Sequence, residues 1–209
     1  MIRVFLADDH EVVRHGLKRI IDAETDMRVV GEVADGRALV RRAEEEGEGW
    51  DVLILDVSLP RVSGLEALRR VRASRPELAI VVLSMYGEEQ YGVQVLRAGA
   101  AAYLSKDRSG EELLAAIRKA ARGGKYVTDV VADQLLSKGG ERPPHERLTA
   151  REYQVFTLVV HGRTVTEIAA ELDLTPGTIS GHLMKVKETL SASSIADIVS
   201  YAHRANLIA

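Results

Sequence analysis

The chain contains the run Asp51-Val52-Leu53-Ile54-Leu55-Asp56, which is the clearest indication of how the N-terminal part folds. Its apolar core is too short for a globular helix, and its branched residues are typical of a buried strand. The strand ends on a single carboxylate, Asp56. Ligands of open parallel sheets bind where the strands end, so we expect the chemistry of this domain at the edge that Asp56 marks.

On both sides of this run, strand-like and helix-like stretches alternate five times with short connections. This alternation predicts a doubly wound, flavodoxin-like α/β domain, in which helices cover both faces of a five-stranded parallel sheet. Gly92 interrupts one helical stretch and makes it the least regular. The expected strands are 2–7, 27–34, 51–56, 78–83 and 101–104, and the expected helices are 11–23, 36–46, 64–75, 88–98 and one beginning at Ser109. The core-facing residues expected in the first helix are Val12, Val13, Gly16, Leu17, Ile20 and Ile21.

Four of the strands deliver polar side chains to one edge. Asp8 and Asp9 follow the first strand, Asp56 closes the third, Ser84 follows the fourth and Lys106 follows the fifth. Taken singly, an Asp after a strand is commonly a helix cap or a turn residue. Together they predict a magnesium site, because clustered carboxylates repel one another unless a cation neutralises them, and Mg²⁺ prefers oxygen ligands.

Such a site has an expected chemistry. With Mg²⁺ bound, Asp56 can attack a phosphoryl donor. The ion and Lys106 then stabilise charge on the transferring oxygens, and Ser84 hydrogen-bonds the product. The expected product is an aspartyl phosphate.

These residues, with Pro60 and Gly64 after Asp56 and with Tyr103 before Lys106, resemble the receiver domain of two-component response regulators over about the first 125 residues. The resemblance implies that Asp56 accepts phosphate from a sensor histidine kinase. It implies that Asp9, Asp56 and the backbone carbonyl of Ser58 ligate Mg²⁺, with Asp8 supporting the metal through water. It also casts Ser84 and Tyr103 as a switch pair, although the spacing of Tyr103 equally suits a half-buried strand aromatic. Tyr86 is expected near the mouth of the site, where its bulk, together with Ser58, would slow hydrolysis of the acyl phosphate.

Length and composition limit the other possibilities. A chain of 209 residues favours two domains, and 46% apolar residues are typical of a globular protein. With no cysteine, no membrane-length apolar run and no leader pattern, we expect a cytoplasmic protein without a membrane partner. The His residues lack a metal-ligand spacing. The net charge of -3 requires any nucleic-acid partner to meet a local patch.

The chain is expected to divide into a receiver domain over 1–125, a linker over 126–145 with a possible short helix at 129–136, and a second domain over 146–209. Gly139-Gly140 and Pro143-Pro144 mark an exposed tether. The second domain reads as a small all-α unit of four helices. Capping boxes at 149–152 and 164–167 predict two helix starts, and Thr175-Pro176 caps a third helix a short turn later, as in a helix-turn-helix.

The third of these helices is expected to bury Ile179, Leu183, Val186 and Leu190. The framework of the domain resembles the LuxR-type helix-turn-helix of the NarL/FixJ class over about 148–208, in Leu148-Thr149, Glu167-Ile168-Ala169, Thr178-Ile179-Ser180-Gly181-His182 and Leu190. The resemblance implies that this helix enters the major groove of double-stranded DNA at promoter half-sites. The expected DNA-binding residues are Thr178, Ser180, Gly181, Met184, Lys185 and Lys187.

The second domain departs from this class in its charge, because groove-facing and phosphate-facing positions usually hold Lys or Arg. From Glu146 onward, the chain contains six basic residues and seven acidic ones. Because phosphate neutralisation supplies most non-specific affinity, we expect weak binding by a monomer. Avidity of a homodimer formed on activation would recover the affinity. The last helix places Ile195, Ile198, Val199 and Ala202 at helical spacing. We expect these residues to contribute partly to the core of the domain and partly to a dimer seam.

We therefore expect a phosphorylation-dependent transcriptional regulator that is no enzyme beyond the turnover of its own aspartyl phosphate. Two alternatives stay open. The acidic balance suits a C-terminal domain that binds a protein instead of DNA. A Mg²⁺-dependent phosphatase with an Asp nucleophile is disfavoured, since Val57 and Ser58 follow Asp56 and supply no general acid two residues on.

Overall fold

The computed structural model describes residues 1–45, 49–85, 87–137, 143–205 and 207. The chain forms two compact units, Met1–Ser137 and Lys138–Ala209. None of the helices in the described part of the chain has the length and apolar character that crossing a membrane requires.

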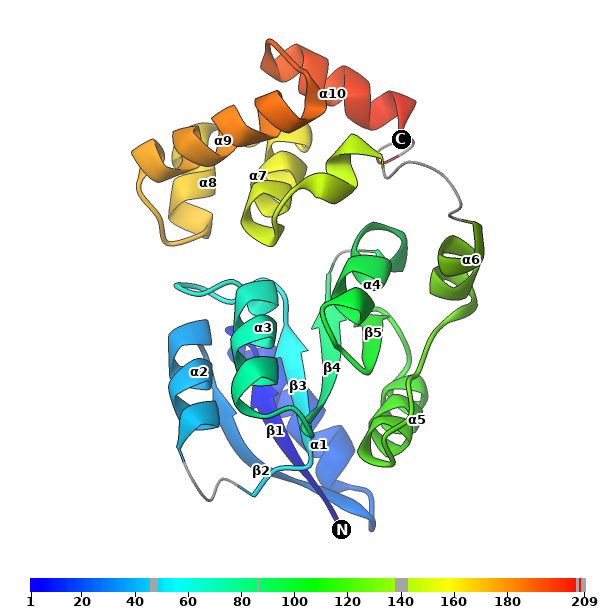
Figure 1. Cartoon of the computed structure of the whole chain (residues 1–209). Helices are drawn as coiled ribbons and strands as arrows, with labels where there is room; N and C mark the ends of the chain where they lie inside the picture. The colour runs from blue at the N-terminus through cyan, green and yellow to red at the C-terminus, as the bar shows by residue number, and fades with distance from the viewer. Residues whose placement is uncertain (46–48, 86, 138–142, 206, 208–209) are drawn as a thin grey trace. The chain divides into compact units, whose positions relative to one another are not determined.

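The first unit contains a five-stranded sheet in which every neighbouring pair of strands is parallel (Figure 1). The strand order is β2-β1-β3-β4-β5, so β3, which carries Asp56, lies in the centre. All five residues of β3 are buried. The flavodoxin-like fold is confirmed, and the strands are β1 (Ile2–Ala7), β2 (Met27–Val33), β3 (Val52–Asp56), β4 (Ala79–Ser84) and β5 (Ala102–Ser105).

Five helices alternate with these strands and cover the sheet. Residues of α1 and α5 pack against alternate positions of the strands, such as Leu6, Ile54 and Leu104, to form one continuous core. Helices α2 and α3 contact β2 and β3, and α4 contacts β5. The helices are α1 (Glu11–Asp22), α2 (Gly36–Glu44), α3 (Gly64–Ser74), α4 (Glu88–Arg97) and α5 (Gly110–Ala121).

Helix α1 buries a narrower stripe than its sequence predicts. Leu17 and Ile21 are buried, but Val12 is 84% exposed and Ile20 is 39% exposed. The expectation that Val12 and Ile20 face the sheet is therefore wrong.

Helix α4 continues through Gly92 without a break, and the reason lies in the segment that follows α5. Helix α6 (Asp129–Ser137) packs on α4, and a Cβ at Gly92 would lie 2.5 Å from Cγ2 of Val131. The absence of a side chain at Gly92 thus leaves room for Val131 of α6. Because α6 belongs to the first compact unit, that unit extends to Ser137, beyond the expected boundary at 125.

Polar contacts fix the same helix pair. The Thr128 hydroxyl donates to Glu88 Oε2 at 2.5 Å, and Arg108 donates to both Glu88 oxygens at 2.9 and 3.0 Å. Glu88 is only 5% exposed, so its buried charge depends on these partners. The start of α4, the loop after β5 and the segment before α6 are therefore held at one carboxylate.

The second unit is helical in the described residues, with a core built from each of its four α-helices. The expected inner stripe is confirmed, since Ile179, Leu183, Val186 and Leu190 are buried. The expected capping boxes at Thr149 and Thr164 are also present, and α5 of the first unit begins with a third one at Ser109. The elements are the 3₁₀ turn Pro144–Arg147, α7 (Ala150–Val160), α8 (Val165–Glu171), α9 (Pro176–Leu190) and α10 (Ile195–Arg204).

Candidate functional sites

Three of the predicted site residues meet at the C-terminal edge of the sheet. Lys106 Nζ lies 2.6 Å from Asp8 Oδ2 and 2.9 Å from Asp56 Oδ2. The two carboxylate side chains are 3% and 1% exposed, and the Lys106 side chain is 8% exposed. One ammonium group thus bridges two buried carboxylates that come from neighbouring strands.

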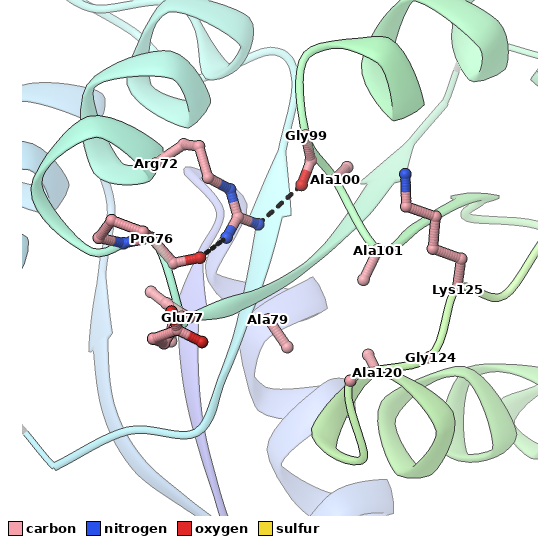
Figure 2. Close-up of a pocket in the computed structure, with 12 residues that line it drawn as sticks. Arg72, Pro76, Glu77, Ala79, Gly99, Ala100, Ala101, Ala120, Gly124 and Lys125 are labelled. Atoms are coloured by element: carbon pink, nitrogen blue, oxygen red, sulfur yellow. Dashed lines mark hydrogen bonds between the residues drawn. The ribbon is translucent and has the colours of Figure 1, made fainter.

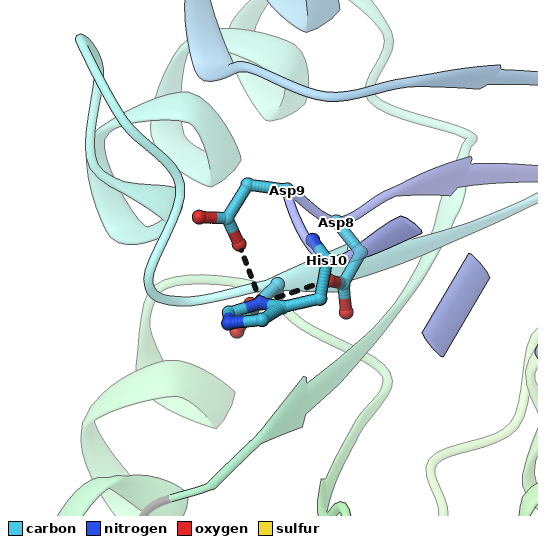
Figure 3. A group of neighbouring side chains, drawn as sticks. Asp8, Asp9 and His10 are labelled. Atoms are coloured by element: carbon cyan, nitrogen blue, oxygen red, sulfur yellow. Dashed lines mark hydrogen bonds and ion pairs between the residues drawn. The ribbon is translucent and has the colours of Figure 1, made fainter. Parts of the chain in front are cut away.

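Asp9 and His10 complete the cluster from the segment that joins β1 to α1 (Figure 3). His10 Nδ1 lies 2.8 Å from Asp9 Oδ1 and 3.4 Å from Asp8 Oδ1. The backbone N–H of His10 donates to Asp8 Oδ1 at 2.8 Å, which fixes that carboxylate. His10 is not among the predicted residues, because a single imidazole beside two aspartates lacks the spacing that is typical of metal-binding histidines.

The loop after β3 is shaped by a glycine. The Gly64 N–H donates to the Val57 carbonyl at 2.9 Å, and a Cβ at Gly64 would lie 2.2 Å from the Asp56 carbonyl oxygen. Only glycine lets α3 begin this close to the end of β3. The Ser58 N–H donates to Asp56 Oδ1 at 3.1 Å. The Ser58 carbonyl remains a predicted ligand.

Burial and charge set the protonation of the cluster. Burial, reinforced by the nearby Asp8 charge and opposed by Lys106, raises the pKa of the Asp56 carboxyl. For Lys106, burial is the largest single effect and lowers the pKa, but the charges and hydrogen bonds of Asp56 and Asp8 together raise it above its ordinary value. Lys106 is therefore a fixed positive charge at neutral pH.

The donor set fits a divalent cation. Single ligand atoms from Asp8, Asp9, His10 and Asp56 all lie within 4.8 Å of one another. Three carboxylates against one ammonium leave negative charge in excess, which a divalent ion would neutralise. Oxygen atoms predominate, as Mg²⁺ requires. Asp8, Asp9 and Asp56 are the residues that would hold it.

The two predicted switch residues are fully enclosed. Ser84 is 0% exposed and Tyr103 is 1% exposed, so Tyr103 is not the half-buried aromatic that its spacing allowed. The backbone N–H of Lys106 donates to the Ser84 carbonyl at 2.7 Å, which connects the end of β4 to the segment after β5. The movement of this pair remains a prediction. Tyr86 lies outside the described residues.

A pocket of about 250 Å³ lies at the opposite end of β4 and β5, between Arg72, Ala79, Ala101 and Lys125 (Figure 2). The Arg72 guanidinium donates to the carbonyls of Pro76 and Gly99. Its charge therefore holds two loops together and is not aimed at a ligand. The pocket is remote from Asp56 and brings no further predicted residue together.

The outward face of α9 contains the expected set of DNA-binding residues. Thr178, Ser180, Gly181, Met184 and Lys185 are exposed, as the helical period predicts. Lys187 is half-buried. The arrangement is a helix-turn-helix in which α8 packs against α9.

Helix α10 divides the predicted dimer seam. Ile198 and Ala202 are 0% exposed, because they pack in the core of their own domain. They cannot also contact a second copy, so including them in the seam is wrong. Ile195 is 47% exposed and Val199 is half-buried. Only these two stay available.

Known protein families match both units of the chain. The response regulator receiver domain matches residues 4–118, and the bacterial regulatory proteins of the luxR family match residues 146–202. The chain belongs to the response regulators. Its class is the one that joins a receiver to a LuxR-type helix-turn-helix.

Curated relatives match over nearly their whole length. This response regulator is 35% identical to the transcriptional regulatory protein LiaR of Bacillus subtilis over 212 residues, covering 100% of both chains. It is 32% identical to the response regulator UvrY of Escherichia coli K12, covering 99% of this chain and 96% of the relative.

A solved structure extends the likeness to the fold. RcsB from Salmonella enterica serovar Typhimurium, bound to promoter rprA in the presence of the phosphomimetic BeF3-, matches with a TM-score of 0.65 and 26% identity. The match covers 97% of this response regulator and 99% of that chain.

Proposed function

We propose that this response regulator receives a phosphoryl group on Asp56 from a sensor histidine kinase and thereby changes to a form that dimerises and binds promoter DNA. The observation that carries the proposal is the Asp56 carboxylate, buried at the end of the central strand and 2.9 Å from Lys106 Nζ. A buried carboxylate with a fixed cation beside it is suited to take up the charge of a transferred phosphoryl group.

The transfer itself forms one bond and breaks one. An oxygen of Asp56 attacks the phosphorus of a phosphohistidine, and the P–N bond to the kinase imidazole breaks as the new P–O bond forms. Mg²⁺, when bound, neutralises charge on the transferring oxygens. Lys106 exchanges part of its pairing with Asp56 for an oxygen of the phosphoryl group, and the Ser84 hydroxyl donates to another.

The buried Ser84 then supplies a route to the rest of the domain. It ends β4 and precedes α4, whose first residue, Glu88, is bound by both Arg108 and Thr128. A shift of Ser84 toward the phosphoryl group therefore alters the support of α6, the last element before the linker. Tyr103, paired in register with Val82 of β4, would follow the same shift.

For the second unit, the proposed partner is double-stranded DNA. The luxR-family match and the promoter named for RcsB support this assignment over binding to a protein. Because the second unit has few basic side chains, a single copy would bind DNA weakly. A homodimer on paired half-sites would therefore be the effective binding form. Ile195, which is exposed, and Val199, which is half-buried, are the accessible part of the proposed seam.

Fluorescence anisotropy tests this assignment, with a labelled promoter fragment taken from upstream of the gene that encodes this protein. Acetyl-phosphate treatment should tighten binding, and the affinity should fall as the salt concentration rises. The slope of this dependence should become shallower by about one for each lysine–phosphate pair that a substitution removes. Lys185→Ala and Lys187→Ala should each weaken binding, whereas Lys125→Ala, an exposed lysine of the receiver, should not. Salt-insensitive binding, or an equal decrease in affinity in all three variants, would refute DNA contact by α9.

We also propose that catalysis is limited to the protein's own aspartyl phosphate. No general acid lies two residues beyond Asp56, where Ser58 stands. Incubation with small phosphomonoesters should release no more than one phosphate for each protein chain. Many turnovers would revive the phosphatase alternative.

A further inference from the structure

The outer surface of α9 lacks most of the side chains that usually read bases, and the exposed lysine that it does carry is Lys185. Its sequence, Pro176 to Leu190, contains no Arg, Asn or Gln. Arg, Asn and Gln recognise base edges through pairs of hydrogen bonds in the major groove. If α9 enters DNA, as the proposed function requires, its selectivity must come from other contacts.

Three polar side chains on the outer surface of α9, Thr178, Ser180 and Lys185, already have partners within the protein. The Ser180 hydroxyl donates to the Pro176 carbonyl at 2.9 Å, and the Thr178 and Thr175 hydroxyls lie 2.9 Å apart. Lys185 Nζ lies 2.7 Å from Glu188, in a pair exposed on both sides. Such an exposed pair is weak, so Lys185 can leave it for a phosphate. The hydroxyls would have to break internal hydrogen bonds to reach a base.

Met184 is the exception on this surface. It is 63% exposed, and in the described residues of the second unit Ile195 is the other large apolar side chain with high exposure. A thioether offers almost no hydrogen bond and gains most from an apolar contact. In the major groove, the apolar group that a base pair presents is the C5 methyl of thymine.

Two glycines beside Met184 have no role in the packing of the domain. A Cβ at Gly181 would meet nothing within 4 Å, and one at Gly177 would meet only Thr175 Oγ1 at 3.8 Å. Glycine inside a helix is unfavourable compared with alanine, so packing does not account for either residue. What a missing side chain does allow is close approach of the backbone to another surface.

We propose that each DNA half-site contains a thymine whose C5 methyl packs on Met184, and that Gly177 and Gly181 admit the helix close enough to the base edges for this contact. Selectivity at this position then comes from apolar contact, and Lys185 and Lys187 contribute affinity through phosphates. This inference rests on the proposed DNA binding and names the base that α9 reads.

Uracil substitution tests the inference, because uracil is thymine without the methyl group. Fragments are selected from a randomised double-stranded DNA pool with the full-length protein treated with acetyl phosphate, and are then copied with deoxyuridine in place of thymidine. We expect the wild-type affinity to fall about fourfold for each methyl group that the complex buries.

The variants assign the effect to Met184. Met184→Ala should bind thymine DNA as weakly as wild type binds uracil DNA and should not distinguish the two, whereas Met184→Leu should keep the preference. Lys185→Ala should weaken both complexes by the same factor. Gly181→Ala should melt at the same or a higher temperature yet bind less tightly, which a purely structural role would not produce.

The contrary results are distinct. Equal wild-type affinity for thymine and uracil DNA, or a thymine preference that survives in Met184→Ala, would overturn the methyl contact while DNA binding stands. A pool from which no sequence is enriched would overturn the proposed DNA binding, and this inference with it.

Discussion

Lys106 is the residue on which the stability of the phosphoacceptor site depends most. It is the cation shared by the buried carboxylates of Asp8 and Asp56. Lys106→Ala would leave both charges uncompensated, so we expect it to lower the free energy of unfolding by about 3–5 kcal/mol in metal-free buffer. Lys18→Ala, an exposed lysine of α1, is the matched control and should change it by less than about 0.5 kcal/mol. The free energies of unfolding are measured by urea denaturation. An equal loss in Lys106→Ala and Lys18→Ala would contradict the ion-pair assignment.

Asp56 should behave in the opposite way. Since burial raises its pKa, the folded state binds its proton more tightly than the unfolded state, and the ionised carboxylate is a cost at neutral pH. Asp56→Asn removes this cost and leaves Lys106 paired with Asp8. We expect the variant to be more stable than wild type at pH 7 by about 1 kcal/mol without divalent ions.

The pH dependence gives the sign of this effect. The cost of Asp56 is absent below its unfolded pKa and fully present above its raised folded pKa, so wild-type stability falls as pH rises through that window. The advantage of Asp56→Asn should therefore shrink as the pH is lowered. A variant whose advantage grows on acidification would show that the Asp56 pKa is lowered in the folded state.

For single residues, the cluster is well predicted by the sequence, because the ends of parallel strands meet at one edge whatever the details of packing. Asp8, Asp56 and Lys106 meet as expected. His10 could not be predicted in the same way, since its approach to Asp9 depends on how the chain turns between β1 and α1. The full burial of Tyr103 likewise depends on side-chain packing that a strand pattern does not contain.

Among the elements, the contact between α4 and α6 is the most specific. The missing side chain of Gly92 receives Val131, whose Cγ2 lies 2.5 Å from where a Cβ would stand. We expect Gly92→Ala to destabilise the first unit by about 1–3 kcal/mol through overpacking and to increase hydrogen exchange in α6.

A second variant separates packing from helix propensity. Alanine favours an isolated helix over glycine by roughly 1 kcal/mol. In a Val131→Ala background, where the Cγ atoms are gone, Gly92→Ala should therefore be neutral or stabilising. Equal destabilisation in both backgrounds would rule out the contact with Val131 as the cause.

Helix starts are the most predictable part of the elements. Ser109, Thr149 and Thr164 cap through local hydrogen bonds that a four-residue pattern contains in full. Packing between elements is not local, and the errors lie there. Val12 and Ile20 lie outside the covered stripe of α1, and Gly92 reads as a helix break without knowledge of α6.

For the whole molecule, the division into two units follows from composition, but the boundary does not. Gly and Pro mark the tether, whereas the docking of α6 extends the first unit to Ser137. Burial of Ile198 and Ala202 reduces the proposed dimer surface on α10 to Ile195 and Val199.

The dimer surface can be tested directly. We expect Ile195→Glu to leave the melting temperature within about 2 °C of wild type, because the side chain is exposed, yet to reduce assembly on a fragment with two half-sites at least about tenfold. Ala196→Glu, one residue along and also exposed, is the control in analytical ultracentrifugation with DNA. Assembly that is unchanged in Ile195→Glu would place the dimer contact elsewhere.

Phosphoryl transfer to Asp56 is decided by mass spectrometry of the intact protein after treatment with acetyl phosphate and Mg²⁺. We expect the wild-type chain to gain the mass of one phosphoryl group, and we expect no gain when EDTA removes Mg²⁺ or when the chain carries Asp56→Asn. A phosphoryl group that persists in Asp56→Asn, or a wild-type chain that gains none, would contradict the assignment of Asp56 as the phosphoacceptor.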